Sequence, residues 1–327
     1  MTNTIAITTY QRPEFLYVTL KSYLACPELK NYNMFFFPDC GHDPDVLKVI
    51  DWFKSQKAAA SVKVFIKDHR KNNQLASYNI LDSYRIALEE SDAEYLIIGE
   101  EDFPVSKDYL RYNHACYTQF LSKFDRIFCA AHKRRHVTHK EGDPSIMIGD
   151  PQCTSPSCIT RKAVETYMLP VFKMPGYFED PSAFFAKHYP NSRIKGYHNH
   201  IDHDGAIERI IEANNLFAIK PDQTRINHIG FVGGHLKEGR YLGHKLEGDL
   251  YKKIATLEYI LQQGLDFMKQ CATHIPEHEK KDWVGITYTP LADYQWSELK
   301  LDLDRNIAKA SEWYYDDTNE FRSYITS

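Results

Sequence analysis

The sequence predicts an α/β fold in which a mostly parallel, mixed sheet is flanked by helices. Through the first hundred residues, short apolar runs rich in β-prone residues alternate with amphipathic segments of helical period, and the connections between them are short. Strands that alternate with helices in this way form parallel sheets with right-handed crossovers, so a Rossmann-like nucleotide-binding half is expected. No Gly-x-Gly-x-x-Gly follows the first strand and there is no Walker loop, which argues against a dinucleotide cofactor and a P-loop ATPase.

Four strands and three helices are expected in this first half. Each predicted strand is a short apolar run suited to burial on both faces. Each predicted helix carries an apolar stripe, and the first one begins with a proline, which the first turn of a helix tolerates. The strands are Ile5–Thr9, Asn33–Pro38, Val62–Ile66 and Glu94–Glu100, and the helices are Pro13–Cys26, Asp45–Lys57 and Leu75–Glu89.

The rest of the chain is expected to complete the sheet and then to form a helical extension. From about residue 240 onwards apolar side chains recur at spacings of three and four, as in Ile254, Leu257 and Leu261, which is the period of a helix. We therefore expect a sheet-containing domain over residues 1–240 and a mainly helical extension over residues 241–327. The apolar stripe of the extension either packs on the first domain or forms a homodimer. Before it, helices are predicted over Lys107–Phe124, Arg161–Leu169 and Gly205–Asn214, and strands over Arg126–Ala131, within Ile146–Ile159 and over Leu216–Ile219.

Composition narrows the range of partners. The 327 residues include 40 basic and 44 acidic side chains, and a net charge of −4 argues against nucleic acid or an anionic membrane as partner. Seven scattered cysteines without metal-like pairs are typical of a reducing compartment. No secretory signal precedes the first strand, and no apolar run reaches the ~18–20 residues of a membrane span, so a cytoplasmic protein is expected.

The most informative stretch is the end of the fourth predicted strand. Glu100, Glu101 and Asp102 are consecutive, and Pro104 prevents the strand from continuing. Adjacent carboxylates repel one another unless a cation lies among them, and open α/β sheets bind ligands beyond the carboxyl ends of their strands. The pattern predicts a divalent-metal site that holds a phosphorylated ligand. The alternative is a solvated acidic turn in which Asp102 caps the next helix.

Four segments stand in a suggestive order: the strand and turn Ile5–Pro13, Asp39 after the second strand, the acidic run Glu100–Asp102, and Asp202–His228 with an acid, a helix, a strand and a late histidine. In this order they resemble the GT-A nucleotide-sugar glycosyltransferases over about residues 1–235. The acidic run resembles the Asp-x-Asp metal motif in the Glu-Asp-Asp-like form of N-acetylglucosaminyltransferases, and family-2-like enzymes fit as well. Glutamate at the first two positions departs from the pattern and leaves open which acid binds metal.

The resemblance implies an inverting transfer of a sugar from a nucleoside diphosphate sugar, expected to be a UDP-sugar, to a hydroxyl of a glycan or another acceptor. Mn²⁺ or Mg²⁺, held by Asp102 and His228, offsets the charge of the leaving diphosphate in such enzymes. A soluble acceptor and a surface polysaccharide both fit. Asp39 would accept a hydrogen bond from the uracil ring. The expected nucleotide-sugar-binding residues are Thr8, Thr9, Tyr10, Arg12, Asp39, Arg70, Asn73, Glu100 and Glu101.

An inverting transfer also needs a general base on the acceptor hydroxyl. Asp204 and Asp202, ahead of the predicted Gly205–Asn214 helix, are the expected catalytic residues, and Glu179 and Asp180 are weaker candidates. A helix N-terminus stabilises a carboxylate as the anion, which holds it in place but lowers its basicity. An N-cap role without chemistry is the alternative for either aspartate.

A second motif points to different chemistry. His198, His200, Asp202 and His203 match His-x-His-x-Asp-His, which resembles the binuclear metal site of metallo-β-lactamase-type hydrolases. Those folds place the motif after antiparallel strands, whereas here it follows a Rossmann-like half. A non-catalytic carbohydrate-binding protein is the third class, and it would not need the acidic run.

Overall fold

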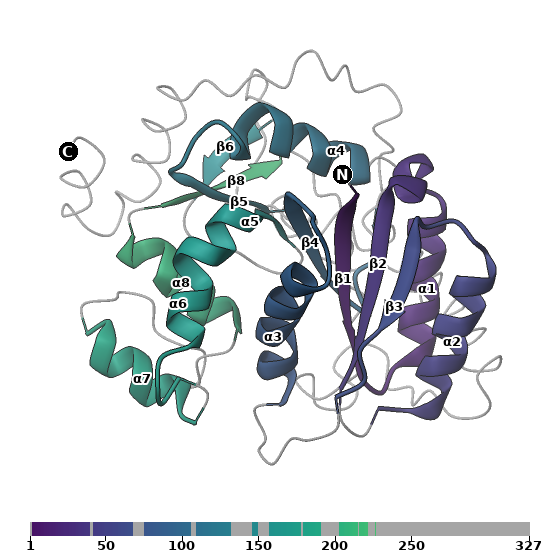
Figure 1. The fold of residues 1–327 in the computed structure, drawn as a ribbon, viewed down its shortest axis with the longest axis horizontal. Coiled ribbons are helices and arrows are strands. Elements are labelled where there is room, and N and C mark those ends of the chain that lie inside the picture. Colours follow the sequence, from purple (N-terminus) through teal and green to yellow (C-terminus); the bar gives the residue numbers. More distant parts are fainter. Residues whose placement is uncertain are drawn as a thin grey trace, which may run out of the picture.

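The structure is a computed structural model in which helices cover both faces of one sheet (Figure 1). It describes residues 2–39, 42–67, 75–105, 109–131, 146–149, 157–177, 179–190, 203–214, 216–221 and 226. The predicted extension over residues 241–327, its apolar stripe and the boundary near residue 240 lie outside these residues. Within the described part of the chain, no helix is long and apolar enough to cross a lipid bilayer.

Four parallel strands form the first half of the sheet. β1 keeps its register with β2 as far as Thr9↔Pro38 and with β4 as far as Thr8↔Glu100, so the carboxyl ends of these strands lie level. β1 begins at the N-terminus and runs downwards in Figure 1, which puts this edge at the bottom of the view. The side chains of β1, β2 and β4 are almost all buried, as expected for strands covered on both faces, whereas those of the edge strand β3 are partly exposed. In spatial order the strands are β3 (Ser61–Val64), β2 (Tyr32–Pro38), β1 (Asn3–Thr9) and β4 (Tyr95–Glu100).

The second half of the sheet is mixed. β7 (Ser157–Thr160) lies between β4 and β5 (Ile127–Ala131) and is antiparallel to both. β8 (Phe217–Pro221) is parallel to β5, and β6 (Ile146–Gly149) is antiparallel to β8. Among the described strands the order is β3-β2-β1-β4-β7-β5-β8-β6. The α/β fold class with a mixed sheet, predicted from the sequence, is confirmed.

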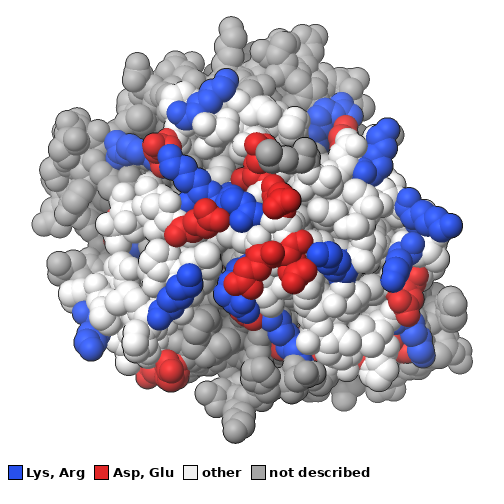
Figure 2. Space-filling model, in the orientation of Figure 1, with Lys and Arg blue, Asp and Glu red and all other residues white. Residues whose placement is uncertain are grey.

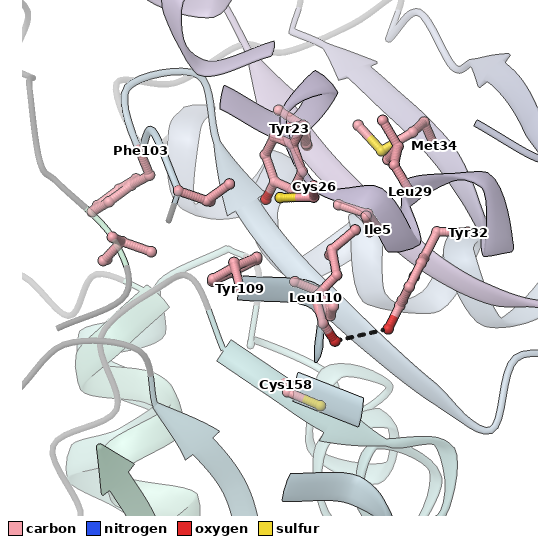
Figure 3. Close-up of a cluster of buried hydrophobic side chains, with 14 of the residues drawn as sticks. Ile5, Tyr23, Cys26, Leu29, Tyr32, Met34, Phe103, Tyr109, Leu110 and Cys158 are labelled. Atoms are coloured by element: carbon pink, nitrogen blue, oxygen red, sulfur yellow. Dashed lines mark hydrogen bonds between the residues drawn. The ribbon is translucent and has the colours of Figure 1, made fainter. Parts of the chain in front are cut away.

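Two apolar clusters hold the helices to the sheet. Along β1, Ile5 and Ile7 face the cluster formed with α1, α2 and α4, and Ala6 faces the cluster formed with α3, α7 and α8. This alternation is the one expected of a strand buried on both faces. Figure 3 shows part of the first cluster, where the rings of Tyr23 and Tyr109 meet edge to face at 5.9 Å. The helices are α1 (Pro13–Leu24), α2 (Pro44–Ser55), α3 (Leu75–Glu89), α4 (Tyr109–Cys116), α5 (Arg161–Ala163), α6 (Leu169–Phe172), α7 (Pro181–His188) and α8 (His203–Ala213), with a 3₁₀ turn at Pro27–Asn31 and π-helical turns at Tyr117–Leu121 and Val164–Met168.

Several helices differ from the prediction. The helix predicted over Lys107–Phe124 is described from Tyr109 and ends in a π-helical turn. The helix predicted over Arg161–Leu169 contains a π-helical turn and extends to Phe172, and the helix predicted from Gly205 includes His203 and Asp204. α7 was not predicted at all, because its eight residues are too few to show a clear period. Its start is nevertheless marked, since the Asp180 carboxylate accepts a hydrogen bond from the Ala183 N–H at 2.9 Å.

Candidate functional site

The level ends of β1, β2 and β4 bring the predicted site residues to one edge of the sheet. Thr8 of β1 is the register partner of both Phe37 of β2 and Glu100 of β4. The Asp39 N–H donates to the Thr9 carbonyl at 2.9 Å, which extends the contact between β1 and β2 by one residue beyond the strands. The turns that follow β1 and β2 are therefore held beside the acidic end of β4.

Arg12 forms ion pairs with two of the three acids, Glu101 and Asp102. Its Nε lies 2.6 Å from Glu101 Oε1, and one of its terminal nitrogens lies 2.9 Å from Asp102 Oδ2. The Tyr10 N–H donates to Glu101 Oε2 at 2.5 Å, and the Thr19 hydroxyl donates to the Glu101 carbonyl at 2.7 Å. Glu101 and Asp102 are each 3% exposed. The guanidinium of Arg12, in the turn after β1, therefore places a positive charge among the acids, a contact that neither the predicted metal site nor the alternative acidic turn includes.

The negative charges of the acidic run outnumber the single positive charge of Arg12. Burial raises the pKa of Glu101 from 4.5 to about 7; Arg12 lowers this pKa, and the neighbouring Asp102 raises it. Burial alone would lower the pKa of Arg12, but Asp102 and Glu101 raise it beyond its ordinary value, so the guanidinium stays charged. When Glu100, Glu101 and Asp102 are all ionised, their three negative charges and the one positive charge of Arg12 leave −2, which a divalent cation would neutralise.

The donor atoms at this edge suit a hard divalent cation in kind. Carboxylate oxygens are the ligands that Mg²⁺ and Mn²⁺ prefer. In the described part of the chain, no three His, Cys, Asp or Glu side chains are arranged as a complete metal site. Of the two predicted metal ligands, Asp102 lies at this edge and His228 lies outside the described residues.

His203 connects the acidic end of β4 to the start of α8. Its Nε2 lies 3.2 Å from Asp204 Oδ1 and 3.8 Å from Glu100 Oε1. Because α8 begins at His203, Asp204 lies in the first turn of the helix and not ahead of it, as was predicted. The first turn of a helix stabilises a carboxylate as the anion. The edge therefore carries a candidate base on one side and the Arg12-bound acids on the other.

At the end of β1, Thr8 and Thr9 are buried, whereas Tyr10, which follows them, is exposed. The Thr8 hydroxyl donates to the Gly99 carbonyl at 3.4 Å, and the buried Thr9 hydroxyl has no hydrogen-bond partner among the described residues. Tyr10 exposes 39% of its surface. The predicted site residues that the structure describes around this edge are Thr8, Thr9, Tyr10, Arg12, Asp39, Glu100, Glu101, Asp102 and Asp204.

Other predicted residues fall elsewhere. Glu179 and Asp180, the weaker base candidates, lie at the start of α7, where the Asp180 carboxylate serves as the helix cap. The remaining predicted residues lie outside the described part of the chain, namely Arg70, Asn73, Asp202 and His228, together with His198 and His200 of the metallohydrolase alternative.

Two polar residues that support the edge were not predicted. The Asn79 side chain in α3 donates from Nδ2 to the Phe37 carbonyl at 2.7 Å and so fixes the end of β2, two residues before Asp39. Thr19 in α1 holds the Glu101 backbone. Each lies within an amphipathic helix, where a single buried polar residue carries no sequence signal of its own.

The face seen in Figure 2 carries acidic and basic side chains interspersed with one another, so no field of a single sign covers it. This distribution agrees with the small net charge of −4.

No protein-family model matches the sequence, and no curated protein matches it. Solved structures to which the chain is similar include S. aureus TarS, residues 1–349, at 13% identity and a TM-score of 0.42, over 69% of this chain and 60% of that chain. The mannosyltransferase PcManGT from Pyrobaculum calidifontis, in complex with GDP-Man and Mn²⁺, is similar at 12% identity and a TM-score of 0.47, over 97% and 88%. An active-site mutant of LgtC is similar at 13% identity and 0.39, over 64% and 70%.

The resemblance implies a mostly parallel, mixed sheet with acids at the end of its fourth strand, and the described strands form such a sheet with Glu100 at the end of β4. The chain has an α/β fold built on one mixed sheet flanked by helices. In it the parallel half of the sheet and the candidate base Asp204 meet at a single edge.

Proposed function

We propose that the protein is a metal-dependent glycosyltransferase that transfers a sugar from a nucleoside diphosphate sugar, a UDP-sugar, to a hydroxyl of a glycan or another acceptor, with inversion of configuration. The observation that carries this proposal is the edge of the sheet where two buried carboxylates, Glu101 and Asp102, pair with Arg12. At the same edge His203 lies between Glu100 and Asp204. A carbohydrate-binding module would need neither the buried acids nor a carboxylate facing them.

The turns after β1 and β2 would bind the nucleoside diphosphate. Asp39, held against Thr9, would accept a hydrogen bond from the N–H of the uracil ring. The Thr9 hydroxyl, which has no partner among the described residues, would contact the ligand, and the exposed Tyr10 ring would lie along it. Arg70 and Asn73 would add donors to the phosphates.

Asp102, with His228 and the diphosphate oxygens, would hold the divalent cation. A bound Mn²⁺ or Mg²⁺ supplies positive charge to a diphosphate that becomes more negative as the sugar departs. Arg12, already on Asp102, keeps this carboxylate oriented and offsets part of the repulsion with Glu101. Glu100 and Glu101 would lie close to the sugar or the ribose of the donor.

Transfer then requires one proton to move. The acceptor oxygen forms a bond to the anomeric carbon as the bond from that carbon to the diphosphate oxygen breaks, and the diphosphate leaves with the electron pair. The proton of the acceptor hydroxyl passes to Asp204. Asp202 is the second candidate for this base.

The metallohydrolase alternative is not supported by the strand order. It expects antiparallel strands in the first half, whereas β3, β2, β1 and β4 are parallel. Its last histidine, His203, lies between two carboxylates.

The proposal is tested by incubating the purified protein with a panel of UDP-, GDP- and CDP-sugars, with Mn²⁺ and with excess chelator, and measuring release of the nucleoside diphosphate. Metal-dependent release from UDP-sugars supports it. Undiminished release in chelator would contradict the cation, and a preference for GDP or CDP would contradict the role of Asp39.

A further inference from the structure

His203 occupies a position that the proposed chemistry has not used. It begins α8, and its side chain is only 14% exposed. Its Nε2 faces Asp204 Oδ1 at 3.2 Å and Glu100 Oε1 at 3.8 Å, although Glu100 and Asp204 come from elements about one hundred residues apart in the sequence. A carboxylate repels the lone pair of an imidazole nitrogen and attracts its N–H, so both contacts are favourable when Nε2 carries the proton.

The helix that carries His203 is firmly anchored. Ala206, Ile207 and Ile210 of α8 are buried in the apolar cluster that also contains Leu96 and Ile98 of β4. The buried Arg209 donates to the Gly205 carbonyl at 3.0 Å, which braces the first turn. The first turn of α8 and the end of β4 thus keep a fixed separation, and the ring of His203 spans it.

We infer that His203 is a positioning residue that holds the Asp204 carboxylate in register with Glu100 across the edge of the sheet. The inference rests on the proposed function, in which Asp204 takes the acceptor proton and Glu100 lies by the donor sugar. A base must be aligned with its hydroxyl before transfer, and a misplacement of about 1 Å can lower the rate about 100-fold. His203 would therefore act on the chemical step and not on capture of the nucleotide.

The test compares His203→Ala, His203→Gln and a control, His188→Ala, in an exposed part of α7. The glutamine amide can place an N–H near the position of Nε2 without a ring. We expect His203→Ala to lower kcat about 10- to 100-fold while KM for the donor and the UDP-induced rise in melting temperature stay unchanged. His203→Gln should restore most of kcat, and the control should match the wild type.

The opposite pattern overturns the inference: an unchanged kcat in His203→Ala, a change confined to KM for the donor, or no recovery in His203→Gln. If the wild-type protein turns over no nucleotide sugar, the proposed function fails. The contact of His203 with Asp204 and Glu100 is then tested by NMR, which needs no enzymatic activity. In protein labelled at histidine Cε1, the His203 resonance, assigned by its loss in His203→Gln, should shift in Asp204→Asn and in Glu100→Gln but not in Glu165→Gln. If the His203 resonance shifts neither in Asp204→Asn nor in Glu100→Gln, the contact is refuted.

Discussion

Replacement of Arg12 by methionine removes the cation from the acidic end of β4 while keeping an unbranched apolar side chain over the Phe15 ring, from which the guanidinium carbon is 5.3 Å distant. Glu101 and Asp102 each lose a contact, of 2.6 and 2.9 Å respectively. We expect the free energy of unfolding to fall, and to fall further at high pH. Below its pKa Glu101 binds a proton and is no longer an unpaired buried charge, whereas above its pKa it is ionised without a partner.

The size of the loss follows from burial. Removing one partner of a buried ion pair costs about 3–5 kcal/mol. Both carboxylates are buried but the Arg12 side chain is 24% exposed, so the lower end applies, about 3 kcal/mol at pH 8.5. At pH 6 Glu101, whose pKa is about 7, is already largely protonated in the wild type. The loss there should fall to about 1–2 kcal/mol, since chiefly the contact with Asp102 remains to be lost.

Urea unfolding of the metal-free protein, followed by tryptophan fluorescence at pH 6 and pH 8.5, measures both values. Arg111→Met is a matched control, because Arg111 makes a partly exposed ion pair of 2.9 Å with Glu28 and should lose less than about 1 kcal/mol at either pH. A loss for Arg12→Met no larger than that of the control, or one that does not depend on pH, would refute the reasoning.

The remaining predictions concern four side chains. Between pH 4.5 and 7 folded Glu101 keeps a proton that the unfolded chain releases, so wild-type, metal-free stability should fall by about 3 kcal/mol as pH rises through this window, measured by urea unfolding. Asp102→Asn should lower Mn²⁺-dependent turnover about 100-fold or more with the circular dichroism spectrum unchanged. Asp39→Asn should weaken UDP binding about 10-fold by calorimetry, with little change for GDP. Asn79→Ala should destabilise the fold by about 1–3 kcal/mol in the same urea assay, because the Phe37 carbonyl loses its buried donor.

The first half of the fold was predictable because local patterns determine it. β1, β2 and β4 are continuous apolar runs, as strands buried on both faces must be, and α3 covers the predicted span Leu75–Glu89. The acidic edge followed from the same logic, since parallel strands end at a common edge. Asp39 and Glu100 were placed there from strand ends alone, and their ligand roles remain predictions.

What could not be predicted depends on contacts between distant residues. The sequence suggested Arg12 for the nucleotide, whereas the structure places its side chain on Glu101 and Asp102, 89 and 90 positions away. Nor does the sequence contain a local sign that β7 inserts antiparallel between β4 and β5. Strand pairing and side-chain reach are set by the packing of the whole sheet, so a periodic pattern in a single segment cannot reveal them.

Because β7 is antiparallel to β4, its two ends lie at opposite edges of the sheet. Ser157 is the register partner of Ile98, two residues before Glu100, so the polypeptide enters β7 on the side where the acids lie. It leaves after Thr160 on the opposite side, where Arg161 donates to the backbone carbonyls of Ala93 and Leu88 at 3.0 and 3.1 Å. The N-terminal end of β7 therefore lies toward the acids, whereas the hydrogen bonds from Arg161 hold the opposite end of β7 to the backbone near the end of α3.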